Sequence, residues 1–233
     1  MSPDNDSDRN QRAKRRFDKY ELVVFDWDGT LMDSAGLIVR CIQASARDLG
    51  LPVPDDAMAA HVIGLGLKDA LSMAVPTLAV EDYPKMSERY RVHFLAGDTE
   101  APLFPGTIDM LGDLAAAGHI LAIATGKSDR GLKRALEATG IGHFFAGTRC
   151  ADQTSPKPAP DMLLELMEEL AMGREATLMI GDTTHDLQMA AHAGVAAVAV
   201  TYGAHPSEQL AAARPLASVH STGELHRWLM QNG

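Results

Sequence analysis

The chain has 233 residues, of which 46% are hydrophobic and 22% are charged, and its formal net charge is −10. This length fits one large domain or two small ones, and the composition supports a hydrophobic core. The acidic charge excludes a general nucleic-acid-binding protein, which needs a basic surface. The two cysteines, Cys41 and Cys150, lie far apart in the sequence, so they form neither a metal motif nor a disulfide framework.

Residues 1–18 contain almost no hydrophobic side chains and predict a disordered N-terminal arm. The arm is basic, which is compatible with contact to RNA or to a membrane surface, but a solvated tail is favoured. No hydrophobic segment of a secretory signal follows it, and no apolar run approaches the roughly 18 residues of a spanning helix. The chain is therefore predicted to be cytoplasmic and to bind neither nucleic acid nor membrane.

Short apolar runs alternate with helical patterns along much of the rest of the chain. In residues 129–140, Leu132, Ala135, Leu136 and Thr139 follow a helical spacing that ends at a glycine, and residues 183–193 predict a second helix. Continuously apolar strands that alternate with helices predict an α/β fold, a Rossmann-like parallel sheet with helices on both faces. The predicted strands are residues 22–25, 119–124, 176–180 and 195–200, with a weaker one at 144–148.

Residues 34–99 contain no convincing strand and do not fit this alternation. They predict helices at 34–50, 55–62, 67–75 and 83–96, separated by prolines and glycines. A crossover between parallel strands needs only one helix. The three additional helices therefore predict an inserted helical domain, or cap, at residues 35–99, and the α/β core then comprises residues 19–34 and 100–233.

Two aspartates, Asp26 and Asp28, come directly after the first predicted strand, and Gly29 permits a sharp turn behind them. Ligands of open α/β sheets bind at the carboxyl ends of the strands, where these side chains would lie. An Asp-Gly turn with a helix cap is the alternative explanation for this segment. A buried carboxylate is costly to desolvate without a partner, so two of them indicate a site with compensating cations.

The later strands end in further polar groups. Thr125 and the N–H of Gly126 follow the second strand, and Lys157 lies between two prolines that stiffen the loop. Asp182 and Asp186 follow the fourth strand, four residues apart, so they share a face of a helical first turn. Each segment alone has an ordinary structural explanation: a strand threonine, a solvated loop lysine or a helix cap.

Taken together, these segments place four carboxylates, a hydroxyl and a lysine at one edge of one sheet. Carboxylates that are close together raise one another's pKa unless cations are present. A hard divalent cation with oxygen ligands removes this conflict, and Mg²⁺ suits a site with few carboxylates, waters and a substrate phosphate. The sequence therefore predicts a Mg²⁺ site that also binds a phosphoryl group.

The segments FDWDGTLMDS, IATGK, SPKPAPD and IGDTTHD resemble the four motifs of the haloacid dehalogenase-like superfamily, in its usual order. The resemblance covers about residues 20–230. The helical insertion resembles the C1-type cap of that superfamily, and the chain looks most like the phosphoglycolate phosphatase-like branch. Trp27 departs from the Leu or Met that is more usual at that position.

The resemblance implies Mg²⁺-dependent hydrolysis of a small phosphomonoester, with 2-phosphoglycolate as a candidate. It implies that Asp26 attacks phosphorus to form an aspartyl-phosphate, and that Asp28 protonates the leaving oxygen and then activates water. It implies that Thr125, Gly126 and Lys157 hold the phosphoryl oxygens. The implied Mg²⁺ ligands are Asp26, the Asp28 backbone carbonyl, Asp182, and Asp186 directly or through a water.

Other functions remain open at this point. A phosphomutase acting on a sugar phosphate keeps both aspartates of the first motif. A phospho-accepting signalling module carries a similar acidic cluster, but such modules are about half this length and lack a cap. The presence of Asp28 argues against a dehalogenase or a P-type ATPase, and a binding-only relative is disfavoured because no motif residue is missing. The oligomeric state is expected to be monomer or dimer.

The cap is expected to select the substrate by closing over the site. Its predicted contact is the loop that contains Gly64, Leu65 and Gly66, because glycines permit close approach of the backbone. A plain turn between helices is the alternative. Lys127 and Arg130 are candidates for contacts with substrate anions, although placement on the surface is favoured for both, and His185 is left without a role.

Overall fold

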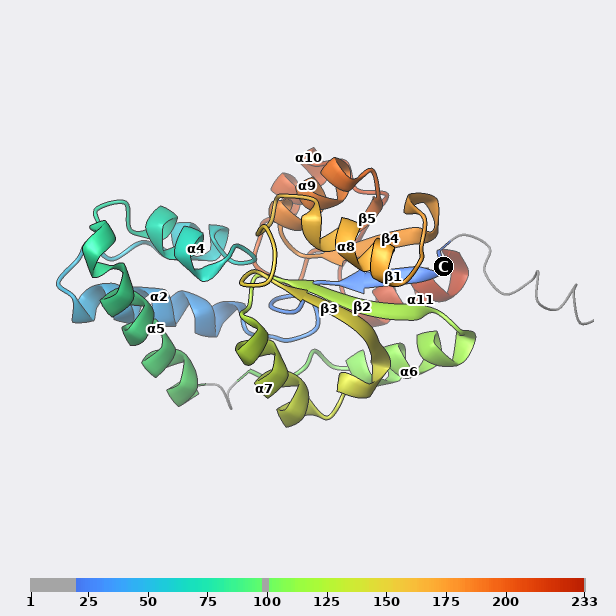
Figure 1. Ribbon diagram of the computed structural model, residues 1–233, viewed down its shortest axis with the longest axis horizontal. Helices are drawn as coiled ribbons and strands as arrows, with labels where there is room; N and C mark the ends of the chain where they lie inside the picture. The colour runs from blue at the N-terminus through green and yellow to red at the C-terminus, as the bar shows by residue number, and fades with distance from the viewer. Residues whose placement is uncertain (1–19, 98–100, 233) are drawn as a thin grey trace, which may run out of the picture.

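A computed structural model describes residues 20–97 and 101–232 of the chain. The predicted arm at residues 1–18 lies outside the described residues, as does part of the predicted boundary between cap and core near residue 99. Figure 1 shows two bodies side by side along the long axis, one built of helices alone and one built around a sheet. Among the described residues, no helix combines the length and the apolar character that a membrane crossing needs.

The sheet of the larger body is parallel throughout, with the strand order β3-β2-β1-β4-β5-β6. Strand β1 lies in the middle, where Val24 faces Ala122 of β2 on one side and Met179 of β4 on the other. This arrangement confirms the predicted α/β class with a Rossmann-like parallel sheet. The strands are β1 (Leu22–Phe25), β2 (Ile120–Thr125), β3 (Phe145–Cys150), β4 (Thr177–Gly181), β5 (Ala196–Val200) and β6 (Ala217–Val219).

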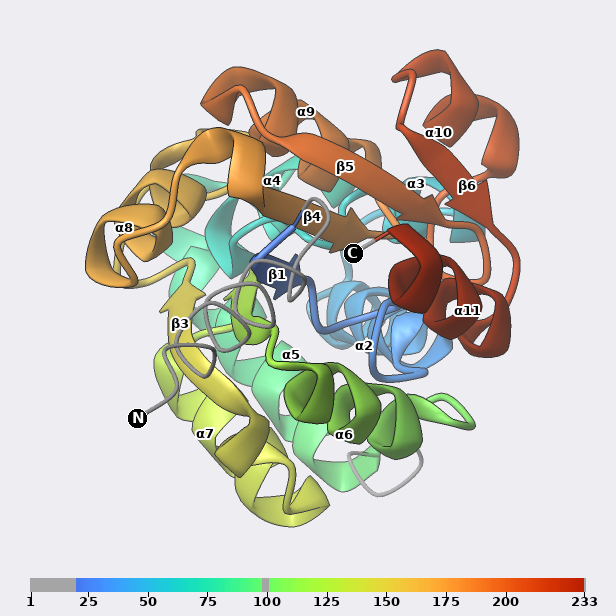
Figure 2. The same cartoon turned by 90° about the vertical axis from the view of Figure 1, so that its right-hand side faces the viewer.

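Helices cover both faces of the sheet, as Figure 2 shows from the end of the molecule. One face carries α8 (Asp161–Glu169), α9 (Thr184–Ala193) and α10 (Ser207–Ala212), and the other carries α6 (Thr107–Ala117), α7 (Asp129–Thr139) and α11 (Thr222–Asn232). Short 3-10 helices at Gly142–Phe144 and Arg174–Ala176 lead into β3 and β4.

The hydrophobic core is divided by the sheet into two layers. In β1, Val23 and Phe25 belong to one layer and Leu22 and Val24 to the other, because successive side chains of a strand point to opposite faces. All four are fully buried. Burial on both faces explains why this strand is apolar at every position and not at alternate ones.

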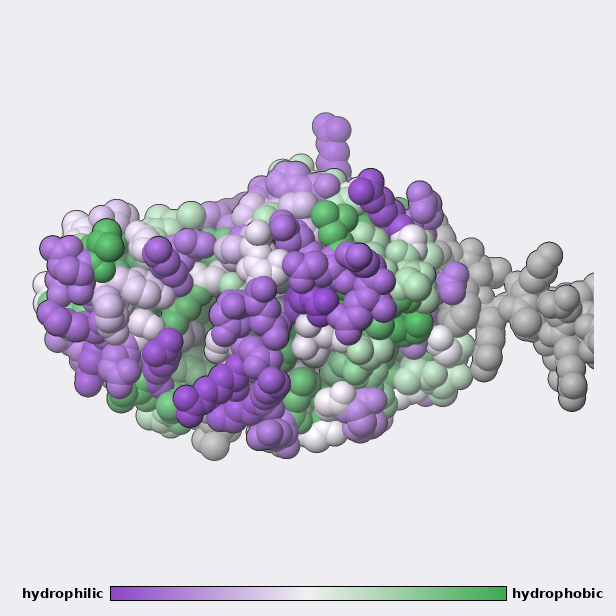
Figure 3. Space-filling view, in the orientation of Figure 1, coloured by the Kyte–Doolittle hydropathy of each residue, from purple (hydrophilic) through white to green (hydrophobic). Residues whose placement is uncertain are grey.

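The smaller body, the cap, consists of helices inserted between β1 and β2 of the core. Figure 3 shows one face of the whole molecule, where hydrophilic residues cover much of the surface and smaller hydrophobic patches lie between them. The helices occupy the interval predicted for the insertion, and the exact boundaries of the two domains stay predictions. The helices are α2 (Ala35–Asp48), α3 (Asp56–His61), α4 (Leu67–Ala74), the 3-10 turn Val80–Asp82 and α5 (Tyr83–Gly97).

The predicted strands and helices agree with the structure to within a residue or two. The sequence reasoning did not identify β6 or the helices α6, α10 and α11. Strand β6 has only three residues and lies at the edge of the sheet, so it is too short to show a periodic pattern. These elements complete the two layers around the core.

Candidate active site

The candidate active site lies at the carboxyl ends of β1, β2 and β4, on the side of the core that faces the cap. Asp26 follows β1 directly, and its N–H donates to the carbonyl of Ile180 in β4 at 2.9 Å, which continues the sheet by one residue. Gly29 then turns the chain back with φ +86°, where a side chain would collide with Asp182. The predicted role of Gly29 in a sharp turn therefore agrees with the structure.

Lys157 joins the first and fourth motifs inside the protein. Its Nζ lies 2.6 Å from Oδ1 of Asp26 and 2.6 Å from Oδ1 of Asp186. The lysine is only 1% exposed and both aspartates are fully buried. Burial alone lowers the pKa of Lys157, but the charges of Asp186 and Asp26 outweigh it and hold that pKa above its ordinary value. This lysine is a buried cation between two carboxylates, and not a solvated loop residue.

Neighbouring groups also fix the positions of both carboxylates of the fourth motif. Asp182 accepts a hydrogen bond from the hydroxyl of Thr30 at 2.8 Å and one from the N–H of Ala204 at 2.7 Å. Asp186 accepts from the N–H of Thr183 and forms a capping box with it at the start of α9. The carboxylates are thus held in fixed orientations before any ligand binds.

Three buried carboxylates, Asp26, Asp182 and Asp186, offer oxygen atoms that all lie within 4.8 Å of one another. Oδ2 of Asp26 is buried and has no hydrogen-bond partner among the described residues. Burial, partly offset by Lys157 and reinforced by Asp186, raises the pKa of Asp26 to about 7, and burial together with Asp26 raises that of Asp182. Such a set fits a hard divalent cation, which would satisfy the free oxygen and stabilise the ionised forms.

Asp28 points toward a different set of groups from Asp26. Its Oδ1 accepts a hydrogen bond from the hydroxyl of Ser34 at 2.7 Å and lies 2.9 Å from Nζ of Lys127. The side chain of Lys127 is 10% exposed, so the favoured placement of this lysine on the surface is wrong. Arg130 is exposed, as expected. Lys127 is folded inward because Asp28 supplies a counter-charge there.

Thr125 and Gly126 complete the core side of the site. Thr125 is fully buried at the end of β2, and its hydroxyl accepts a hydrogen bond from the N–H of Lys127 at 3.2 Å. A Cβ atom at Gly126 would lie 2.5 Å from the carbonyl oxygens of Gly64 and Leu65. Only a glycine allows the cap backbone to approach this closely.

The predicted cap loop therefore lies directly on the core beside the carboxylates. A Cβ at Gly64 would lie 3.1 Å from the hydroxyl oxygen of Thr183, and one at Gly66 would lie 3.3 Å from Cβ of Ala151. The loop thus meets the segments after β2, β3 and β4. Contact of the loop with substrate stays a prediction. Because the loop packs on three segments of the core, it does more than join two helices of the cap.

Sequence reasoning did not identify a cluster of three histidines at the boundary of core and cap. The carbonyl of His61, at the end of α3, accepts from Nε2 of His185 at 2.8 Å and from Nε2 of His205 at 3.0 Å. Nδ1 of His205 accepts from the N–H of Thr184 at 3.1 Å. The three residues have no common sequence spacing, so no pattern in the sequence indicates that they meet.

Burial lowers the pKa of both core histidines, and that of His205 falls to about 4, with the charge of His185 as the next cause. Both imidazoles are therefore neutral donors near neutral pH. They hold one cap carbonyl against the core, next to Asp186. His185 has a structural explanation that does not involve a metal.

Comparison with known proteins places this site in a family. The family model of the haloacid dehalogenase-like hydrolases matches residues 23–200. The chain is 39% identical over 215 residues to a protein named probable phosphatase IndB from Dickeya dadantii, which covers 88% of this chain and 91% of that protein. It is 32% identical over 205 residues to a phosphoglycolate phosphatase from Vibrio cholerae, at 84% and 90% coverage.

The fold agrees with this assignment. A crystal structure described as a predicted phosphoglycolate phosphatase from Haemophilus somnus superposes with a TM-score of 0.80, at 26% sequence identity, over 90% of this chain and 98% of that one. The family that the four motifs indicate is thus confirmed, and phosphoglycolate phosphatases are among the relatives. The chain is an enzyme that belongs to the haloacid dehalogenase-like hydrolases.

Proposed function

We propose that the chain is a Mg²⁺-dependent phosphatase that hydrolyses a small phosphomonoester through a covalent phosphate on Asp26. The observation that carries this proposal is the state of that side chain. Lys157 holds Oδ1 of Asp26 at 2.6 Å, while the buried Oδ2 has no hydrogen-bond partner within residues 20–97 and 101–232. A carboxylate with one oxygen fixed and the other free is arranged for attack on a ligand.

The other residues of the site take roles around this nucleophile. The hydroxyl of Thr125, the N–H of Gly126 and the ammonium of Lys157 would bind the oxygens of the transferring phosphoryl group. Asp28 would donate a proton to the leaving oxygen and then remove one from the attacking water. Ser34 and Lys127 hold the carboxylate of Asp28 in place for this work.

The metal would be held by Asp26, Asp182 and the backbone carbonyl of Asp28, with Asp186 as a direct or water-mediated partner. Three carboxylates and Lys157 leave two negative charges in the buried cluster, which one divalent cation balances. When bound, Mg²⁺ supplies charge stabilisation for the phosphoryl oxygens.

The cap and the relatives limit the substrate. The cap loop lies on Gly126 at backbone distance, so a folded protein or a long nucleic acid would not reach the buried carboxylates without displacing it. Relatives named phosphoglycolate phosphatase support a small phosphorylated metabolite, with 2-phosphoglycolate as the first compound to test. A monomer or dimer stays the prediction for the oligomeric state.

The test combines turnover with trapping of the intermediate. Purified protein is assayed with Mg²⁺ for release of inorganic phosphate from small phosphomonoesters, and acid-quenched single turnovers with labelled substrate are assayed for phosphate bound to protein. The wild type is expected to release phosphate repeatedly and to yield labelled protein, and Asp26→Asn to do neither, because an amide is a poor nucleophile.

A matched control is Asp109→Asn, the same chemical change at an exposed position in the first turn of α6. It is expected to behave as the wild type. Transfer of phosphate between sugar positions without net release would identify a phosphomutase, and one labelling event without turnover would identify a signalling module. Trapped label in Asp26→Asn would show that the nucleophile is assigned wrongly.

A further inference from the structure

Asp182, one of the proposed metal ligands, is held at both of its carboxylate oxygens by neighbouring groups. The N–H of Ala204 donates to Oδ2 at 2.7 Å, and the hydroxyl of Thr30 donates to Oδ1 at 2.8 Å. Each oxygen of an ionised carboxylate can accept about two bonds, so both oxygens of Asp182 can still contact a cation. Ala204 belongs to the loop of residues 201–206, which joins β5 to α10.

This loop packs directly on Asp182. A Cβ atom at Gly203 would lie 2.3 Å from Oδ2 of Asp182 and 2.4 Å from its Cβ, so only a glycine allows the main chain to come this close. The N–H of His205 donates to the main-chain carbonyl of Asp182 at 3.3 Å. Three consecutive residues of the loop therefore surround Asp182 and block rotation of its side chain toward them.

A fourth residue of the loop, Tyr202, reaches the other oxygen of Asp182 through Thr30. The phenol of Tyr202 donates to the main-chain carbonyl of Thr30 at 3.1 Å, and it has a second hydrogen bond with the side chain of Thr222 in α11. Burial raises the pKa of Tyr202, so the phenol keeps the proton that it donates. Tyr202 therefore fixes the residue whose hydroxyl fixes Oδ1 of Asp182.

Thr30 depends on this bond because its own turn holds it weakly. The N–H of Thr30 lies 3.4 Å from the carbonyl of Trp27, which is long for such a hydrogen bond. Tyr202 is itself oriented by Phe104, in the segment that leads from the cap back to the core. The two ring centres are 4.6 Å apart and the rings meet edge to face at 67°. The phenol is thus directed at Thr30 by an aromatic pair.

We propose that Tyr202 is a positioning residue that orients the metal ligand Asp182 through Thr30, so that loss of its phenol weakens the binding of Mg²⁺. Hydrogen bonds behind a metal ligand raise affinity because they hold the ligand in the orientation that the metal needs. Tyr202 acts one step further out, through the main chain and the hydroxyl of one residue. The inference rests on the proposed function, because it assumes that Asp182 binds the metal.

The test measures Mg²⁺ affinity without turnover. The dissociation constant, Kd, is taken from the rise of the melting temperature with Mg²⁺ concentration, and the melting temperature in chelator reports the metal-free fold. Tyr202→Phe keeps the ring beside Phe104 but loses the phenol. It is expected to raise Kd by about 3- to 10-fold, which is less than the usual effect of a direct partner of a ligand. Because the loss lies in affinity, kcat at saturating Mg²⁺ is expected to stay near the wild-type value.

A double-mutant cycle with Thr30→Val tests the route of this effect. Thr30→Val removes the hydroxyl that donates to Asp182 and is expected to raise Kd by about 10- to 100-fold. In that background the phenol has no hydroxyl through which to act. Tyr202→Phe is therefore expected to raise Kd by less than about twofold when it is added to Thr30→Val.

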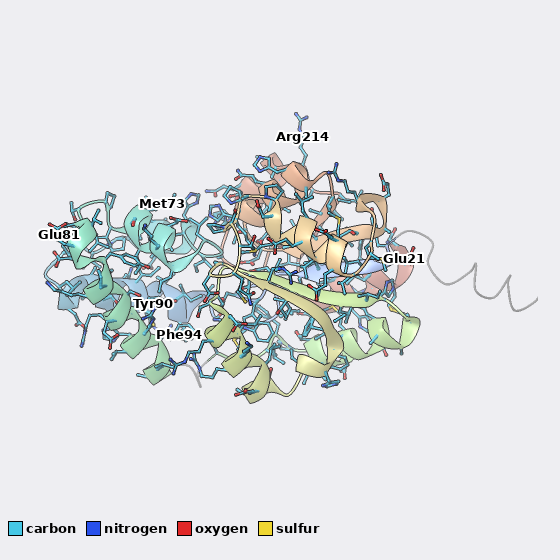
Figure 4. All side chains as sticks on the ribbon, viewed as in Figure 1. Glu21, Met73, Glu81, Tyr90, Phe94 and Arg214 are labelled. Carbon is cyan, nitrogen blue, oxygen red and sulfur yellow. The ribbon has the colours of Figure 1, made fainter. Side chains whose placement is uncertain are left out.

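Tyr83→Phe is the matched control. Tyr83 is half-buried, as Tyr202 is, and its phenol has a hydrogen bond with Ser87. It begins α5 two residues after Glu81, which Figure 4 labels at the end of the cap that points away from the core. Both tyrosine variants are expected to melt about 2–4 °C lower in chelator, the usual effect of one lost hydrogen bond in a chain of this size. Only Tyr202→Phe is expected to change Kd.

The outcomes separate this inference from the proposed function. A wild-type Kd in Tyr202→Phe, with only the melting temperature lowered, would show a purely structural role and overturn the inference. An equal effect of Tyr202→Phe with and without the hydroxyl of Thr30 would also overturn it. A wild type that follows the predicted cycle of affinities but releases no phosphate would overturn the proposed function and leave the inference standing. Absence of Mg²⁺ binding to the wild type would overturn the proposed metal site and this inference with it.

Discussion

The core and the cap contribute to the candidate site in different ways. The core supplies buried side chains from four separate loops, among them Asp26, Lys157 and Asp182. The cap contacts the site with main-chain atoms. The carbonyls of Gly64 and Leu65 lie against Gly126, and the carbonyl of His61 accepts hydrogen bonds from two histidines of the core. Phe94 is an exception, because it brings a cap side chain to Lys127.

This difference predicts that the core and the cap affect different steps of the reaction. Reaction chemistry needs particular functional groups, so it depends on the side chains of the core. Closure of the cap over the core needs a loop whose shape fits the core surface, and many sequences can form such a loop. Changes that break core groups should therefore affect chemistry most, and changes at the boundary should affect closure and stability.

The largest expected effect is that of Asp28→Asn in the core. The variant keeps the nucleophile and the backbone carbonyl, but it loses the group that donates and removes a proton. Turnover is expected to fall by about 10²–10⁴-fold, the usual contribution of general acid–base catalysis. With an activated substrate whose leaving group needs no proton, the covalent phosphate is expected to form and accumulate, as measured by acid quench.

Asp33→Asn is the matched control, because Asp33 is exposed five residues further along the same segment. Its turnover is expected to equal that of the wild type. A wild-type rate in Asp28→Asn would show that proton transfer does not limit the reaction or does not involve this residue.

The second prediction concerns the metal and its dependence on pH. Burial raises the pKa of Asp26 to about 7 in the metal-free protein, well above the 3.8 of an exposed aspartate. The folded state therefore holds a proton that the unfolded state has released, and the stability of the metal-free protein falls as pH rises from about 4 to about 7. A cation replaces that proton, so its benefit grows over the same interval.

Mg²⁺ at a hundred times its dissociation constant is expected to stabilise the protein by about 3 kcal/mol at about pH 8, and by clearly less at about pH 5.5. The measurement is the melting temperature with Mg²⁺ and with a chelator at both pH values. Asp182→Asn removes one ligand and is expected to abolish most of the gain. An equal gain at both pH values would contradict the assignment of protonated carboxylates to the metal site.

The sequence predicted the site residues of the core more completely than the contacts of the cap, for the same physical reason. Asp26, Asp182 and Lys157 are polar residues at the ends of apolar strands or in the adjoining loops, and this pattern is unusual enough to indicate a site by itself. The contact of Gly64 and Leu65 with Gly126 involves carbonyl groups that every residue possesses. Glycine indicated that a close approach was possible there, but it did not identify the partner.

Lys127 shows a second limit of sequence reasoning. A lysine in a loop is usually solvated, and surface placement was the reasonable expectation. Its inward position depends on Asp28, Ser34 and Phe94, which lie far from it in the sequence and come from both bodies of the molecule. The histidine cluster is similar, because residues 61, 185 and 205 are brought together only by the packing of cap on core.

The third prediction tests the approach of the cap backbone to the core. In Gly126→Ala the new methyl group would lie 2.5 Å from the carbonyl oxygens of Gly64 and Leu65, so the cap loop must move away. We expect kcat/KM to fall by about tenfold, because a small misplacement of closing groups is costly in catalysis. The three atoms nearest to the new methyl group belong to the cap backbone, so Mg²⁺ is expected to stabilise the variant as it does the wild type.

Gly112→Ala is the matched control, since a Cβ at Gly112 on α6 meets no atom within 4 Å. It is expected to leave kcat/KM unchanged and to stabilise the helix slightly. If Gly126→Ala retains full activity, the cap loop does not need to approach this closely during the reaction.

The smallest expected effect is at the histidine contact, where the core donates to the cap. His205 donates through Nε2 to the carbonyl of His61, and its Nδ1 accepts from the N–H of Thr184, so a second proton on the ring would break the latter bond. This agrees with a folded-state pKa lowered from 6.5 to about 4, chiefly by burial and then by the charge of His185. The unfolded chain therefore binds this proton at higher pH than the folded chain, and the stability present above about pH 6.5 is lost as pH falls toward 4.

In His205→Gln this loss disappears, so the difference in unfolding free energy between wild type and variant is expected to shrink by about 1 kcal/mol between about pH 8 and about pH 5.5. Urea unfolding at both pH values measures it, and parallel pH dependences in the two proteins would show that the neutral imidazole does not hold the cap carbonyl.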